Sequence, residues 1–83
     1  MEELIKQQLQ DHISKDWGLE RLRKLRAFEM NDYQVKLYNS NLDTEVTIEF
    51  CVTEKGFVMN ISKLRGILER AEIEKGNIFA EAI

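Results

Sequence analysis

Two side chains in this 83-residue sequence are candidates for nucleophilic or metal chemistry, namely the single histidine and the single cysteine. His12 lies four residues before Asp16, so both could share one face of a helix, but a zinc site needs about four ligands. A pair of His12 and Cys51 would supply a base and a nucleophile, yet nothing in the sequence brings the two together. We therefore interpret both as structural residues and expect no enzyme activity, no metal and no cofactor.

The setting of Cys51 also argues against a reactive thiol. Such a thiol needs nearby cations that lower its pKa, whereas its neighbours on the same strand face would be Glu49 and Thr53. A lone cysteine forms no intramolecular disulfide, which favours a reducing compartment. The first residues, MEELIKQQLQ, lack the apolar core of a secretory signal, and no apolar run approaches the ~18 residues of a membrane span. We expect a cytoplasmic protein with no membrane partner.

The densest group of charges is the basic stretch GLERLRKLRAF (18–28). Its four basic residues are Arg21, Arg23, Lys24 and Arg26. Leu22 and Leu25 lie three residues apart, which predicts a helix over 19–30. On a helical wheel the first and third basic residues lie on one flank of the leucines, and the second and fourth lie on the other. We interpret the stretch as a packed amphipathic helix whose basic side chains cover the edges of the core. The alternative is that one flank contacts phosphate or an acidic partner.

Periodicity predicts the other elements. Ile5, Leu9 and Ile13 repeat every four residues, which indicates a helix over 2–15 that either ends at Gly18 or continues, kinked, to residue 30. Alternation of apolar and polar residues predicts strands over 33–38, 44–54 and 57–62, joined by short turns at 40–43 and 54–56. A third helix would start after Ser62, with its apolar residues at Leu64, Ile67, Leu68 and Ala71. It would end at Gly76 and be followed by a short terminal helix.

These elements predict a single α+β domain over residues 1–83. Its three strands form an antiparallel meander, with an N-terminal helix or helix pair and a C-terminal helix packed on one face. The composition, 43% hydrophobic and 33% charged, is ordinary for a globular protein. The net charge is −3 and the pI is about 5.2, whereas a dedicated nucleic-acid-binding domain usually has a pI above about 9.

Three sets of residues are candidate contact surfaces. The basic set comprises Arg21, Arg23, Lys24, Arg26, Lys63 and Arg65. The sheet-face set lies on the polar sides of the predicted strands and comprises Lys36, Tyr38, Glu49 and Asn60, with Gln34, Thr47 and Thr53 beside them. The C-terminal set comprises Ile78, Phe79 and Ile83, which either complete the core or form a homodimer interface.

The predicted element order, with Lys63 and Arg65 at the start of the last long helix, resembles the double-stranded-RNA-binding domain. This resemblance covers roughly the whole chain and implies RNA binding by the basic set. Two features of that family are not matched here. The loop SNLD (40–43) is acidic, and the segment SKLR (62–65) only loosely matches a paired-lysine motif.

The segment NDYQVKL (31–37), followed by two predicted strands and a helix, resembles one of the small phage-encoded Cas9 inhibitors. The resemblance implies a small acidic inhibitor, although the turn TEKG (53–56) replaces the acidic loops that such inhibitors use as DNA mimics. Neither resemblance assigns a family. The absence of proline and the many Ile, Lys and Asn residues hint at a bacterial or phage origin. We predict an intracellular, non-enzymatic protein-interaction module, such as a regulator, adaptor or inhibitor, with a nucleic-acid-binding domain as the alternative.

Overall fold

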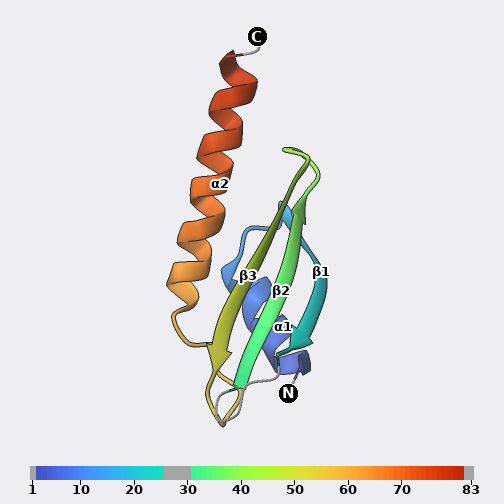
Figure 1. Cartoon of the computed structure of the whole chain (residues 1–83), viewed down its shortest axis with the longest axis vertical. Helices are drawn as coiled ribbons and strands as arrows, with labels where there is room; N and C mark the ends of the chain where they lie inside the picture. Colours follow the sequence, from blue (N-terminus) through green and yellow to red (C-terminus); the bar gives the residue numbers. More distant parts are fainter. Residues whose placement is uncertain (1, 26–30, 82–83) are drawn as a thin grey trace.

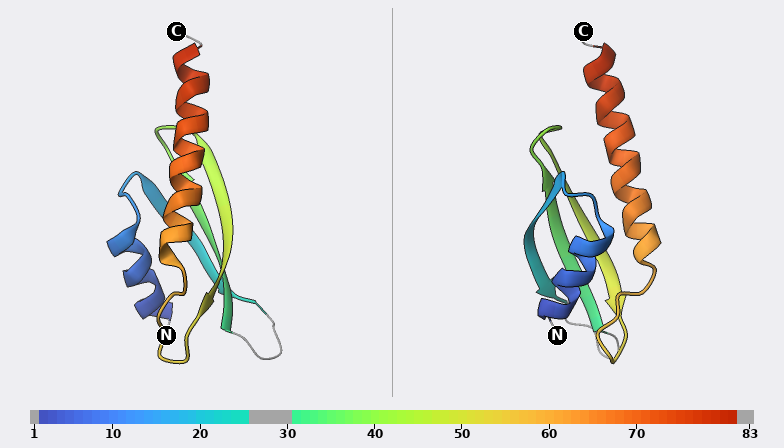
Figure 2. Two further views of the ribbon diagram at one scale, coloured as in Figure 1. Left: turned by 90° about the vertical axis from the view of Figure 1, so that its left-hand side faces the viewer. Right: turned by 180° about the vertical axis from the view of Figure 1, so that it is seen from behind.

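The computed structural model describes residues 2–25 and 31–81, and the side chains of residues 2–25 and 31–75. The elements in chain order are α1 (Glu2–His12), β1 (Trp17–Lys24), β2 (Asn31–Asn39), β3 (Thr44–Val52) and α2 (Ile61–Glu81). The strands form one open antiparallel sheet in the order β1-β2-β3. Both helices lie on the same side of this sheet, as the views in Figure 1 and Figure 2 show. The predicted fold class, an α+β meander flanked by an N-terminal and a C-terminal helix, is confirmed.

The core lies between the two helices and one face of the sheet. α1 contributes Ile5 and Leu9 of the predicted stripe, the third member, Ile13, directly follows the helix, and all three side chains are buried. The other buried apolar residues are Trp17 of β1, Tyr33, Val35 and Leu37 of β2, Ile48, Phe50 and Val52 of β3, and Leu64 and Leu68 of α2. In β2 and β3 every second residue is therefore buried, as the period of two predicts. The intervening side chains face away from the helices.

The helix predicted over 19–30 is wrong for its described part, because residues 17–24 form strand β1; residues 26–30 lie outside the described residues. The alternative of one long kinked helix is wrong for the same reason, and Gly18 lies inside the strand. In the register of β1 and β2, Leu19 is opposite Leu37 and Arg21 is opposite Lys36, so Glu20 is an extra residue in a β-bulge. The bulge shifts the alternation by one position. Leu19 and Leu22 consequently both face the core although they are three residues apart, a spacing that imitates one turn of a helix.

The strand predicted over 57–62 is also wrong. After β3 the chain turns back and forms a single bridge between Val58 and Val52. The Met59 N–H donates to the Cys51 carbonyl at 2.9 Å. Asn60 then adopts a left-handed φ of 55°, a conformation that asparagine tolerates better than most residues. This turn ends the pairing, and α2 begins at once, so that the third strand of the sheet is β1 instead.

α2 is one continuous helix of 21 residues, so the predicted end at Gly76 and the separate terminal helix are wrong. It also begins at Ile61, one residue before the predicted cap Ser62. Its first half packs on the sheet through Leu64 and Leu68. Its second half extends past the end of the sheet (Figure 1), and Ile73 is 63% exposed.

Candidate functional site

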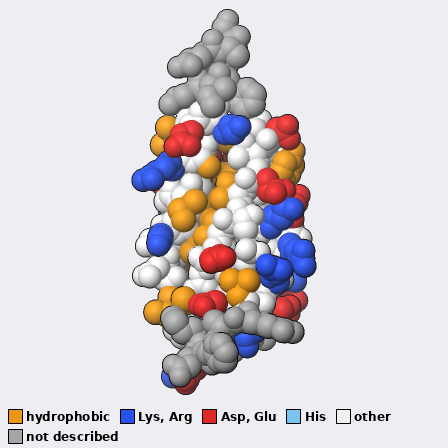
Figure 3. Space-filling model, viewed as in Figure 1, with side chains coloured by type: hydrophobic (Ala, Val, Ile, Leu, Met, Phe, Trp, Pro, Cys, Tyr) orange, Lys and Arg blue, Asp and Glu red, His pale blue; other side chains and the backbone are white. Residues whose placement is uncertain are grey.

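The side of the sheet away from the helices carries polar side chains from all three strands, and we call it the open face. It comprises Arg21 and Arg23 of β1, Asp32, Gln34, Lys36 and Tyr38 of β2, and Glu45, Thr47, Glu49 and Cys51 of β3. Strand alternation places them there, since their neighbours along each strand are turned toward the core. Figure 3 views this face; Lys and Arg side chains gather on its right, where β1 lies in Figure 1, and others lie on its left, where α2 lies.

The charges of the open face are divided across the sheet. Arg21 and Arg23 stand on the β1 edge, whereas Glu45 and Glu49 stand on the β3 edge. Between them, Lys36 Nζ lies 3.3 Å from Glu45 Oε2. An exposed pair of this kind contributes only about 0.2–1 kcal/mol to stability. The surface therefore has a positive edge and a negative edge that one ion pair joins.

A shallow hollow of about 270 Å³ lies on the open face between the arginines and Glu45. Its floor is formed by Gln34, Lys36 and Thr47. The Arg23 Nε donates a hydrogen bond to Gln34 Oε1 at 3.1 Å, which holds the guanidinium against β2. The hollow is lined by three cations, one carboxylate, one amide and one hydroxyl, and histidine is not among its lining residues.

The structure divides the predicted basic set. Arg21 and Arg23 were expected on opposite flanks of a helix, but they share the open face because residues two apart on a strand point the same way. Lys24 is opposite Tyr33 and lies on the other side of the sheet. Arg26 lies outside the described residues. Lys63 lines a groove beside β3, whereas Arg65 lines a hollow that His12 and Trp17 also border, so the six residues do not form one patch.

Three members of the sheet-face set, Lys36, Tyr38 and Glu49, lie on the open face where the alternation places them. The fourth, Asn60, does not, because it belongs to the turn before α2. The Tyr38 hydroxyl donates to Asp43 Oδ1 at 2.7 Å. This hydrogen bond raises the pKa of Tyr38, with smaller contributions from desolvation and from the charges of Asp43 and Glu20. The phenol is therefore held against its own turn.

Cys51 has an acidic neighbour that its own strand did not reveal. In the register of β2 and β3 it is opposite Asp32, and its thiol donates to Asp32 Oδ1 at 2.9 Å. This hydrogen bond, followed by desolvation and the charge of Asp32, raises the pKa of the Cys51 thiol. A protonated thiol is a poor nucleophile, so the geometry supports a structural role. His12 ends α1 and is exposed, and no three metal-binding side chains cluster among the described side chains of residues 2–25 and 31–75.

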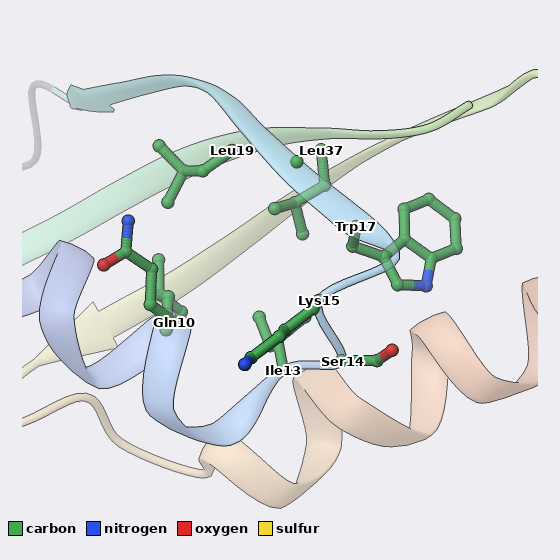
Figure 4. A pocket seen from close by; sticks show the side chains of 9 residues that line it. Gln10, Ile13, Ser14, Lys15, Trp17, Leu19 and Leu37 are labelled. Atoms are coloured by element: carbon green, nitrogen blue, oxygen red, sulfur yellow. The ribbon is translucent and has the colours of Figure 1, made fainter. Parts of the chain in front are cut away.

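A second hollow, of about 340 Å³, opens between the end of α1 and β1 (Figure 4). Its walls are largely the core residues Leu9, Ile13, Trp17, Leu19 and Leu37, with Gln10, Ser14 and Lys15 at its polar part. This polar part offers one amide, one hydroxyl and one ammonium group. Most of the lining consists of core side chains, so we interpret the hollow as an uncovered margin of the core.

The C-terminal set cannot be placed as a surface. Ile78 and Phe79 belong to α2, but their side chains lie outside the described ones, and Ile83 lies outside the described residues altogether. Self-association through this set stays a prediction.

Over the described part of the chain, neither helix is long and apolar enough to cross a membrane. No protein-family model matches this chain. No curated protein and no solved structure matches it significantly either. A proposal about function therefore has to come from the geometry of the surfaces themselves.

Proposed function

We propose that this protein is a non-enzymatic protein-interaction module, such as a small regulator, adaptor or inhibitor, that contacts its partner through the open face. The observation that carries the proposal is the division of charge on that face. Arg21 and Arg23 stand beside Lys36, and Glu45 and Glu49 stand on the far edge. A surface with a positive edge and a negative edge favours a folded partner that has negative charge facing the first edge and positive charge facing the second.

Nucleic acid fits this face less well than a protein does. A phosphate backbone is attracted by the arginines, but the glutamates of β3 and the net charge of −3 repel it. Sheets that bind RNA usually stack bases on exposed aromatic rings. On the described strands the open face carries one such ring, Tyr38, and its hydroxyl is bonded to Asp43.

Nucleic-acid binding nevertheless has one observation in its favour. Arg21, Arg23 and Lys36 are neighbours in the register of β1 and β2, so three cations share one surface, which the helical interpretation did not allow. This second candidate predicts binding that weakens steeply with salt.

The experiment is an affinity capture from native lysate with the immobilised chain, performed with and without nuclease. The test variant is Arg21→Glu/Arg23→Glu. The matched control is Lys15→Glu/Lys75→Glu, which reverses two exposed cations outside the open face. We expect a partner protein to be captured even after nuclease treatment. The control variant should still capture this protein and the test variant should not, while circular dichroism should show that both variants fold.

Two results would contradict the proposal. Capture that disappears with nuclease, together with salt-sensitive binding of a random duplex oligonucleotide, would favour the nucleic-acid candidate. Equal capture by the test and control variants would show that the open face is not the contact surface.

A further inference from the structure

The two edges of the sheet are not equally protected. Natural sheets guard their edge strands with bulges and charged side chains against pairing with other chains. β1 has both devices, namely the bulge at Glu20 and the basic residues Arg21, Arg23 and Lys24. β3 has nine residues, all of them paired with β2 without a bulge, and none is proline. It does carry two charged residues, Glu45 and Glu49, but without a bulge its outer edge is regular.

Two hydrogen bonds show which backbone groups of β3 point outward. The Thr53 N–H donates to the Phe57 carbonyl, and the Cys51 carbonyl accepts from the Met59 N–H. Groups of the same strand alternate in direction, so the N–H and C=O of Glu45, Thr47 and Glu49 also point away from β2. Among the described residues these three have no backbone partner on that side. Residues 57–59, which return along β3, therefore pair with it as a short fourth strand would, and this pairing ends at Asn60.

A groove of about 180 Å³ lies beside the unpaired edge, between β3 and the start of α2. Its apolar lining comprises Ile48, Phe50, Met59, Leu64 and Ile67, and its basic member is Lys63. Ile67 is 36% exposed and Met59 is 47% exposed. In Figure 3 hydrophobic side chains run down the middle of the view, between α2 and the strands. A strand added about 4.8 Å from β3 would place every second side chain over this groove.

We propose that the outer edge of β3 is a docking site for an extended segment of a partner protein, which pairs with Glu45, Thr47 and Glu49 as an added strand. The occupant carries apolar side chains toward the groove and Lys or Arg at the alternate positions. Those alternate positions lie on the open face, opposite Glu45 and Glu49. Glu49 makes no ion pair with any described residue, so a cation on the added strand would be its first partner. Backbone pairing then supplies affinity, and the charges and groove supply selectivity.

The charge of β3 argues against a second copy of this chain as the occupant. In the two-fold antiparallel pairing with the longest overlap, Thr47 would be opposite its own copy. Glu45 of each chain would then be opposite Glu49 of the other, and like charges directly across a ladder destabilise it. The inference does not depend on Arg21 or Arg23, so it can hold or fail separately from the proposed function.

The test is amide hydrogen exchange, measured by NMR on the full chain with a synthetic nine-residue peptide of alternating Lys and Val. At a peptide concentration ten times the Kd, the exchange of the Glu45, Thr47 and Glu49 amides should slow by about tenfold. The Val46 and Ile48 amides should not change, because they already bond to β2. The control peptide, with alternating Glu and Val, should protect none of them.

Two variants separate edge pairing from general attraction. Thr47→Pro removes the central outward N–H without removing a bond to β2, and it should abolish protection by the Lys–Val peptide. If this variant does not fold, Glu49→Lys serves instead and should weaken binding by about two- to fivefold, as expected for the loss of an exposed ion pair, while the matched control Glu69→Lys on α2 leaves it unchanged.

Three outcomes would overturn the proposal. They are protection by neither peptide, equal protection by both peptides, and protection of the same amides in the free chain that grows with its own concentration. The last outcome would identify a second copy as the occupant. Loss of capture by Arg21→Glu/Arg23→Glu has no bearing on these readouts, so failure of the edge proposal and failure of the proposed function are distinguishable.

Discussion

The contact between the tryptophan and the long helix gives the sharpest stability prediction. Trp17 is 5% exposed, and its Nε1–H donates to Glu72 Oε1 at 2.7 Å. The bond joins the start of β1 to the middle of α2, near the point where the helix leaves the sheet. The change Glu72→Ala removes the acceptor and leaves the indole N–H in a largely buried position without a partner.

A buried hydrogen-bond donor without a partner destabilises the folded state by about 1–3 kcal/mol. A chain of this length has a total stability of roughly 4–12 kcal/mol at about 0.05–0.15 kcal/mol per residue. The free energy of unfolding should therefore fall by about 1–3 kcal/mol, and each kcal/mol should lower the Tm by roughly 4–8 °C. Glu72→Gln keeps an oxygen acceptor and should cost less than Glu72→Ala.

The assay is urea unfolding, followed by circular dichroism for all variants and also by tryptophan fluorescence for those that keep Trp17. The control is Glu74→Ala, because Glu74 is exposed on the same helix and such changes usually stay within about 0.5 kcal/mol. A double-mutant cycle with Trp17→Phe isolates the bond, since Glu72→Ala should cost little once the indole N–H is absent. A Glu72→Ala midpoint equal to that of Glu74→Ala would refute the reasoning.

Three further changes test other parts of the structure. Gly66→Ala should raise the free energy of unfolding by about 0.5–1 kcal/mol in a thermal melt, because a Cβ there meets nothing within 4 Å and alanine favours a helix; a lower Tm would contradict this. Leu9→Ala should lower the free energy of unfolding by about 2–5 kcal/mol in urea, because Leu9 is 1% exposed; a loss below about 1 kcal/mol would show that the core is poorly packed there. Asp32→Asn should lower the pKa of Cys51, whose thiol loses the carboxylate that raises it. Alkylation of Cys51 by iodoacetamide should then accelerate at mildly alkaline pH, and an unchanged pH–rate profile would mean that Asp32 does not control the thiol.

Periodicity was sufficient for β2 and β3, and insufficient for β1, for a physical reason. β2 and β3 pair with each other without irregularity and bury one face, so the period of two is visible in their sequences. In β1 the bulge at Glu20 interrupts the period and brings Leu19 and Leu22 to the same side. A bulge depends on the partner strand, which a single segment of sequence does not contain.

Two predictions around α2 were wrong, namely the strand over 57–62 and the helix end at Gly76. Met59 and its neighbours alternate in polarity, but Asn60 turns the chain before a second ladder can form. Gly76 was expected to end the helix, yet one glycine costs a helix only about 1 kcal/mol, and α2 continues through it. For residues 57–62 the alternation of polarity was present, but it contained no information about a partner strand.

The candidate site was only partly predictable. The sequence alone placed Lys36, Tyr38 and Glu49 on one face, because these residues belong to the regular strands. It separated Arg21 from Arg23 because a helical wheel was applied to a strand. The contact of Cys51 with Asp32 joins residues 19 positions apart, so it required the register of the sheet.

The bulged strand β1 also bears on the order in which the chain folds. Its residues include Leu19, Glu20, Arg21, Leu22, Arg23 and Lys24, all of types that favour helices when no partner is present. Local preference and native conformation therefore conflict in this segment, whereas they agree across the hairpin of β2 and β3. We expect the hairpin to form first with α1 and α2 collapsing onto it, and β1 to join last, after transient helical turns in residues 19–25 have melted.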